Sequence, residues 1–171
     1  MALQSKVSIN MAPAIVGMPA SVVESHYTAL TYQAASDLTV GNFCFADKTN
    51  PGSQVNAAGT GLIRGFVMYT RQYVTGSVVA ENSMTIAKGS FVQIATNGKF
   101  WAIAQNANAK VGDFVLVNQK DGSITTQTGN ANKAGFSMTN FVVEKVMGTA
   151  AKSMILISNQ QPNVVPPMAG A

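Results

Sequence analysis

Hydrophobic and polar residues alternate over short stretches along most of this chain, which is the period of a β-strand. In the run FVQIA, Phe91, Gln93 and Ala95 share one predicted face, and Val92 and Ile94 share the other. No stretch keeps the 3.6-residue period of an amphipathic helix. The pattern therefore predicts an all-β protein with little helix.

A short phrase recurs three times in front of such runs: a glycine, one further residue and a phenylalanine. The copies are VGNFCFADKTNPG from Val40, KGSFVQIATNG from Lys88 and VGDFVLVNQKDG from Val111. In the last two, Asn97-Gly98 and Asp121-Gly122 supply the positive φ that a tight hairpin turn requires. Because KFWAIA and SITTQ follow these turns, each of the two copies predicts a β-hairpin.

Turn-forming residues divide the middle of the chain into short segments. We expect one β domain over residues 24–159, an antiparallel β-sandwich or barrel of about eight to ten strands. Residues 22–35 alternate poorly and are predicted as a loop or an irregular strand. A short helical turn within residues 127–140 is compatible with the sequence.

Prolines interrupt both ends of the chain. Residues 1–23 are predicted as an extended N-terminal arm, in which Pro13 and Pro19 exclude a long helix. An arm of about 20 residues can span roughly 65 Å when fully extended. Residues 160–171 are predicted as an extended C-terminal tail, because proline cannot lie inside a paired strand.

The composition favours association with a partner. Charged residues make up 11% of the chain, against about 25% in ordinary soluble domains, and a weakly charged surface is poorly protected against association. A compact domain that tolerates a neutral surface is the alternative. The net charge of +4 permits nucleic-acid binding, but the basic residues are spread evenly. We therefore expect no direct contact with nucleic acid.

Residues with catalytic or metal-binding chemistry are few. His26 is the only histidine and Cys44 the only cysteine, too few for a histidine–cysteine metal cluster. The acidic residues are dispersed, and Asp47 and Asp121 lie at turns, where they are expected to bond nearby backbone. There is no GxSxG sequence and no phosphate-binding glycine motif. The sequence therefore predicts a protein that is not an enzyme, with no catalytic residue, metal site or cofactor.

The hydrophobic stretch near the N-terminus is not a targeting segment by its pattern. Prolines and glycines break residues 7–23 before they reach the length of a signal sequence or a membrane span. We expect synthesis in a cytoplasm without a signal peptide, and no contact with a membrane.

Several pieces of the sequence, taken in order, resemble a known family. They are MALQSKVSINMAPAIVGMPAS, VGNFCFA, GFVMYTR, SMTIAKGSFVQIATNGKFWAIA and KVGDFVLVNQKDGSI. Their order and spacing, over roughly Met1 to Asn159, resemble the structural cement (head-decoration) proteins of tailed bacteriophages. The resemblance implies a virion protein on the outer surface of an icosahedral head, where it locks neighbouring major capsid protein subunits together. It also implies a homo-oligomer, a trimer rather than a dimer.

Apolar residues of both ends are the expected partner contacts. They are Val7, Ile9, Met11, Ile15, Val16 and Met18 in the arm, and Val164, Val165 and Met168 in the tail. Two other functions remain open. One is a basic β-barrel that binds single-stranded nucleic acid. The other is an adhesin or tail module that binds a glycan in a pocket around Trp101 or Tyr69.

Overall fold

The computed structural model describes residues 14–20, 27–70 and 84–160. This part of the chain forms twelve strands and no helix, so it holds no helix long and apolar enough to cross a membrane. The strands are β1 (Thr28–Ala34), β2 (Leu38–Thr39), β3 (Phe43–Ala46), β4 (Gln54–Asn56), β5 (Ile63–Val67), β6 (Thr85–Ile86), β7 (Phe91–Asn97), β8 (Lys99–Ala104), β9 (Phe114–Asn118), β10 (Ile124–Gln127), β11 (Phe136–Met147) and β12 (Ser153–Ser158).

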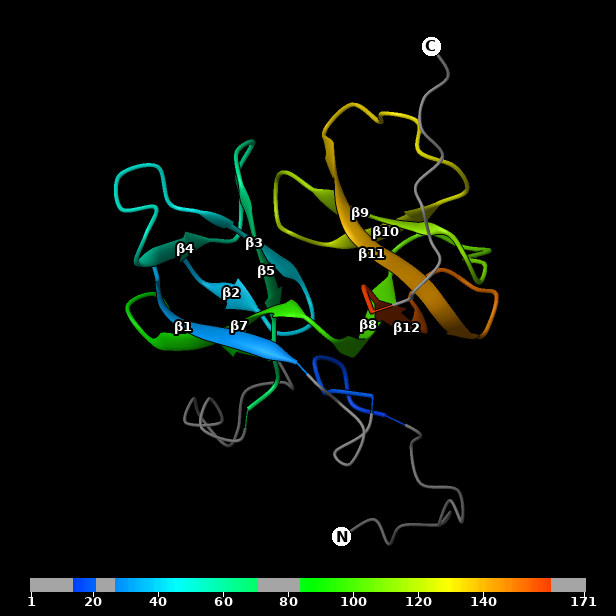
Figure 1. Cartoon of the computed structure of the whole chain (residues 1–171), viewed down its shortest axis with the longest axis horizontal. Helices are drawn as coiled ribbons and strands as arrows, with labels where there is room; N and C mark the ends of the chain where they lie inside the picture. Colours follow the sequence, from blue (N-terminus) through cyan, green and yellow to red (C-terminus); the bar gives the residue numbers. More distant parts are fainter. Residues whose placement is uncertain (1–13, 21–26, 71–83, 161–171) are drawn as a thin grey trace, which may run out of the picture.

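Ten of these strands close into two barrels that lie next to each other (Figure 1). The first barrel has the order β1-β4-β3-β5-β7 and the second the order β10-β8-β12-β11-β9, while β2 and β6 form a separate two-stranded sheet. The all-β prediction is confirmed. Strands are more numerous than expected because β2, β4 and β6 have only two or three residues, too few to show an alternation in the sequence.

The two barrels have the same topology. In each, one pair of strands is parallel and the other four pairs are antiparallel. The strands of the two barrels correspond in chain order: β1 to β8, β3 to β9, β4 to β10, β5 to β11 and β7 to β12. Each strand has the equivalent two neighbours in both barrels. The described chain is therefore an internal duplication.

Hydrogen bonds at equivalent positions support the duplication. The amide of Gly41 donates to Val67 O at 2.9 Å, and the amide of Gly112 donates to Val143 O at 2.8 Å. In return, Val67 N donates to Asn42 O at 2.8 Å, and its counterpart Val143 N donates to Asp113 O at 2.9 Å. The first and third copies of the glycine phrase thus occupy the same place in the two barrels.

The three glycines of the repeated phrase share one backbone conformation. Gly41, Gly89 and Gly112 have φ values of 84°, 87° and 88°. In each case the residue after the glycine donates its amide to the carbonyl three positions earlier, at 3.1–3.2 Å. This is the hydrogen bond of a β-turn with positive φ at its third position, where glycine is preferred. Each turn leads the chain into a strand.

In the second barrel, a residue other than glycine has positive φ just before a strand. Lys152 has φ +62° directly before β12, and Gly89 has φ +87° two residues before β7. An L-residue in this conformation is strained by about 1–2 kcal/mol. We predict that Lys152→Gly raises the free energy of unfolding by about 1 kcal/mol, as measured by urea denaturation. Lys120→Gly, at an exposed turn lysine without positive φ, should be neutral or destabilising; an equal gain there would contradict the explanation.

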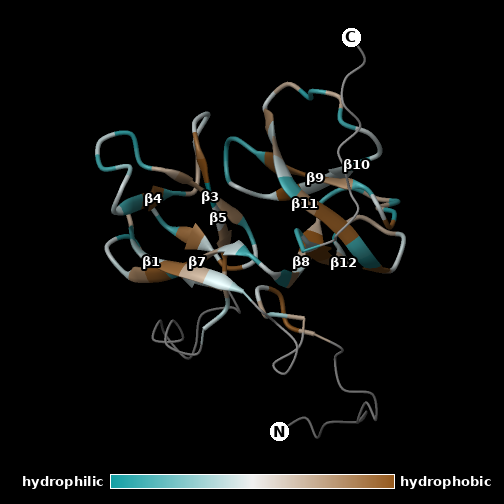
Figure 2. Cartoon of the chain, in the orientation of Figure 1, coloured by the Kyte–Doolittle hydropathy of each residue, from teal (hydrophilic) through white to brown (hydrophobic). Residues whose placement is uncertain are grey.

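The barrels share a hydrophobic core. Alternation sends Cys44 and Val67 into the interior of the first barrel, while their neighbours Phe43 and Phe66 point out of it toward the second. There the Phe66 ring stacks on Phe100, with centroids 5.1 Å apart, and Phe43 meets Phe141 edge-on at 5.4 Å. Figure 2 shows hydrophobic residues along the strands of both barrels and hydrophilic residues in several connecting loops.

The same alternation is found in β7. Val92 and Ile94 lie on one face, toward the interior of the first barrel, and Ala95 lies on the other, toward the shared core, which confirms the predicted division of faces. Phe91 is 69% exposed at the start of the strand.

The predicted hairpin at Asn97-Gly98 is wrong. Strand β7 pairs with β1 and β5, whereas β8 belongs to the second barrel. Gly98 does have positive φ, at 140°, but it carries the chain from one barrel into the next. A Cβ there would lie 2.8 Å from Tyr27 Cβ and 2.6 Å from the Phe100 ring. Glycine is therefore required by close packing at this crossing, and the hairpin at Asp121-Gly122 between β9 and β10 is confirmed.

Two smaller predictions also change. The segment predicted as a loop or irregular strand contains β1, whose pairing with β7 is irregular only between Thr28 and Ala29. No helical turn occurs in residues 127–140, because β11 already begins at Phe136, where it pairs with Asn118 of β9.

Candidate partner-binding surfaces

The described part of the N-terminal arm pairs with the edge of β8. The amide of Gly17 donates to Trp101 O at 2.7 Å, Trp101 N donates to Met18 O at 3.0 Å, and Ala20 N donates to Lys99 O at 2.9 Å. An antiparallel bridge joins Pro19 to Phe100 between them. The arm therefore adds a short strand to the second barrel.

The arm also packs against the first barrel through another glycine turn, Val16-Gly17. It has the same geometry as the turns of the three repeated phrases, with φ +85° at Gly17 and a bond of 3.1 Å from Met18 N to Ile15 O. A Cβ at Gly17 would lie 2.4 Å from Val40 Cγ1, and a Cβ at Gly41 would lie 2.1 Å from Val16 Cγ1. Each valine thus covers the glycine of the other turn. The repeated phrase does not reveal this turn in the sequence, because Met18 and Pro19, and no phenylalanine, follow Gly17.

This interlock yields a stability prediction. Gly17→Ala should lower the free energy of unfolding by about 2–4 kcal/mol, because the added methyl group overlaps Val40 and strains the turn. Gly89→Ala is the matched control, since φ is +87° there and a Cβ would meet nothing within 4 Å. It should lose only the strain, about 1–2 kcal/mol. Equal losses in urea denaturation would show that the interlock contributes nothing.

The predicted partner residues fall into three groups. Ile15 is 44% exposed and available to a partner, whereas Val16 and Met18 are half-buried. The remaining six lie outside the described residues: Val7, Ile9, Met11, Val164, Val165 and Met168. Their contact with a partner stays a prediction.

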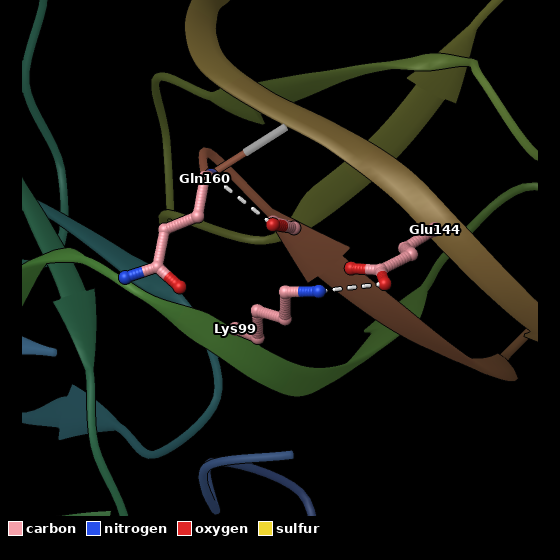
Figure 3. Close-up of polar contacts among 4 residues, drawn as sticks. Lys99, Glu144 and Gln160 are labelled. Carbon is pink, nitrogen blue, oxygen red and sulfur yellow. Dashed lines mark hydrogen bonds and ion pairs between the residues drawn. The ribbon is translucent and has the colours of Figure 1, made fainter. Parts of the chain in front are cut away.

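The C-terminal tail begins on the other side of β8. Ser158 of β12 pairs with Lys99, and its hydroxyl accepts the amide of Gln160 at 3.1 Å. Lys99 also forms an ion pair with Glu144 of β11 at 2.8 Å, which Figure 3 shows together with Gln160. The arm therefore pairs with one edge of β8, and the tail begins at the end of β12, which pairs with the other edge of β8.

A cleft of about 460 Å³ lies between the barrels. It is lined by the start of β5, around Leu62 and Arg64, and by the irregular part of β11 at residues 137–141. Arg64 is the only charged residue of its lining, and its guanidinium already donates to Pro51 O and lies over the Tyr32 ring. The cleft thus has neither an acidic group nor a histidine for general acid–base chemistry.

The side chains that could carry chemistry are buried or bonded within turns. Burial raises the pKa of the Cys44 thiol to about 12, so the thiol is unreactive at neutral pH. Asp47 and Asp121 accept amide protons within their own turns, as predicted. Within the described residues, no cluster of histidine, cysteine, aspartate or glutamate could hold a metal ion; His26 lies outside them.

The proposed glycan pocket has no counterpart in the described cleft. Trp101 is only 8% exposed where the arm runs along β8. Neither Trp101 nor Tyr69 lines the cleft between the barrels.

Comparison with known proteins connects this fold to phage capsids. Residues 3–159 match the family described as structural cement protein (E217 gp24/Pam3 gp6). A similar solved structure comes from the capsid of Myoviridae phage XM1, with a TM-score of 0.65 and 17% identity over 93% of this chain and 98% of that one. Another is the head fiber gp8.5 N base of bacteriophage phi29, with a TM-score of 0.42 and 14% identity over 81% and 99% of the two chains. No curated protein matches. The chain belongs to the structural cement protein family and is a structural protein of the bacteriophage virion.

Proposed function

We propose that this protein binds the outer surface of the phage head and bridges neighbouring major capsid protein subunits. The observation that carries the proposal is that the arm and the tail both leave the second barrel next to β8, the arm paired with β8 itself and the tail continuing from its neighbour β12. A segment that is fixed at one end to a rigid barrel can transmit force from a neighbour to that barrel. Two such segments allow one chain to hold two subunits.

The chemistry of the terminal segments supports this role. The arm outside the described residues alternates apolar and polar side chains at Val7, Ile9 and Met11, and the tail carries Val164 and Val165. An extended segment with this pattern can add to an exposed sheet edge of a neighbour, where backbone bonds give affinity and alternate side chains give register. The arm already pairs with β8 in this manner.

The proposal includes self-association into a trimer, or alternatively a dimer. Closed symmetry is the usual outcome when identical chains occupy equivalent positions on a surface. Copies bound around a local threefold axis of the head would form such a trimer.

Co-sedimentation with undecorated, expanded heads tests this function. We expect saturation at a fixed number of copies per capsid subunit and heads that withstand higher temperature before they release DNA. Binding should survive moderate salt, because salt screens contacts between charges, such as those to phosphate, and does not screen apolar contacts. Folded protein that fails to bind matched heads would contradict the proposal. Binding to single-stranded DNA that declines steeply with salt would instead support the nucleic-acid alternative.

A further inference from the structure

The two barrels carry the same turn in opposite surroundings. Val40-Gly41 in the first barrel is covered by the arm, and Val40 is only 5% exposed. Its counterpart Val111-Gly112 in the second barrel is held by the equivalent hydrogen bonds to β11, yet Val111 is 68% exposed. A Cβ at Gly112 would meet nothing within 4 Å. The second barrel therefore presents an uncovered copy of the surface that the arm covers in the first.

At the turns that contain Gly17, Gly41, Gly89 and Gly112, the residue before the glycine matches the burial of the turn in three cases and differs in one. Valine precedes the glycine in the interlocked pair, at Val16 and Val40. Lysine precedes it at the open turn Lys88-Gly89, where a solvated side chain is expected. Val111 is the exception, because it is apolar and exposed. Val111 is exposed to solvent as Lys88 is, but it has the apolar side chain found at the covered turns, Val16 and Val40.

We propose that the Val111-Gly112 turn is a self-association surface that interlocks with the same turn of a second copy of this chain. The contact between Val16-Gly17 and Val40-Gly41 is reciprocal, since each valine lies over the glycine of the other turn. It joins two turns with φ values of 85° and 84° at glycine and the same hydrogen bond. Two turns of one kind can therefore meet about a local twofold axis. Two copies of the Val111-Gly112 turn, one from each chain, are identical and can meet in the same way about an exact twofold axis.

The contact is small. Two turns bury far less than the roughly 1,200 Å² typical of a stable interface. It is therefore weak in dilute solution and acts between copies that are already close together. The inference does not depend on capsid binding, and it can be tested with the free protein.

Cross-linking of Val111→Cys tests the proposal. The full-length variant is treated with a short bis-maleimide at about 1 mM, and the native Cys44 does not compete because it is buried. We expect self-linked dimers to form at least about tenfold faster than for Lys88→Cys, which places the thiol on a turn of the same geometry. Equal rates for the two variants would overturn the proposal.

A second pair of variants separates the interlock from simple exposure. In the Val111→Cys background, Gly112→Ala should slow cross-linking about tenfold, because the methyl group occupies the space that the partner's side chain enters. Gly89→Ala carries the same backbone strain at φ +87° in a turn outside the contact, and should leave the rate unchanged. If Gly112→Ala has no effect, or if it slows the reaction no more than Gly89→Ala does, the turns do not interlock.

Discussion

Removal of residues 1–13 is expected to weaken binding to undecorated phage heads by at least about 100-fold while leaving the free energy of unfolding unchanged. Each apolar side chain that becomes buried contributes about 1.5–3 kcal/mol, and the deleted segment carries Val7, Ile9 and Met11. A loss of about 2.7 kcal/mol already corresponds to 100-fold. The fold should survive because Gly17 and Ala20, which hold the arm on β8, remain.

Two comparisons make this truncation informative. Deleting residues 1–18 instead also removes the Val16-Gly17 turn, and should reduce stability as well as binding. In the full chain, serine at Val7, Ile9 and Met11 should reproduce the binding loss, whereas alanine at Ser8 and Asn10, on the opposite face of the predicted strand, should not. Head binding of the 1–13 deletion at full-length affinity, measured by co-sedimentation, would show that the arm is not a partner contact.

Phe66→Ala is expected to lower the free energy of unfolding by about 3–5 kcal/mol and to destabilise both barrels together. Phe66 belongs to the first barrel, is fully buried and stacks on Phe100 of the second. Its removal leaves a cavity between the barrels that neither can close alone. The same reasoning applies to Phe141→Ala from the second barrel, which meets Phe43.

The single tryptophan allows the two barrels to be followed separately. Trp101 lies in β8, so its fluorescence reports on the second barrel, while far-UV circular dichroism reports on both. For Phe66→Ala, the two signals should give the same midpoint in urea. Val92→Ala, which changes only the interior of the first barrel, should also move both signals together, by less. A tryptophan transition that stays at the wild-type midpoint would show that the barrels unfold independently and that residues 24–159 are not one cooperative domain.

Local strand character could be read from the sequence because it depends on neighbouring residues. The phrase Gly-x-Phe predicted the starts of β3, β7 and β9, and the alternation predicted that Val92 and Ile94 share one face of β7. The conformation of Gly98 was also predictable from Asn97-Gly98. Its consequence was not, because a positive φ can close a hairpin or redirect a strand, and only the packing of Phe100 decides between them.

The pairing of strands that are distant in the chain could not be predicted, for the same reason. Each barrel closes through contacts between residues far apart in the chain, such as Leu30 with Ile94, and no local pattern encodes these. The duplication is equally hidden, since Gly89 and Lys152 adopt similar φ values with different side chains. For the candidate site, the sequence indicated the arm as a contact segment. It did not indicate that Val16 packs on Gly41 of its own chain, which leaves Ile15 as the exposed member of that group.

Double photo-cross-linking on decorated heads tests the bridging role most directly. A photoreactive residue is placed at Ile9 in the arm and a second at Val165 in the tail of the same chain, and the products are sized after irradiation. The account predicts a product that contains one copy of this chain joined to two major capsid protein subunits, and its loss when either photoreactive residue is omitted. Products that never contain more than one capsid subunit per chain would contradict it.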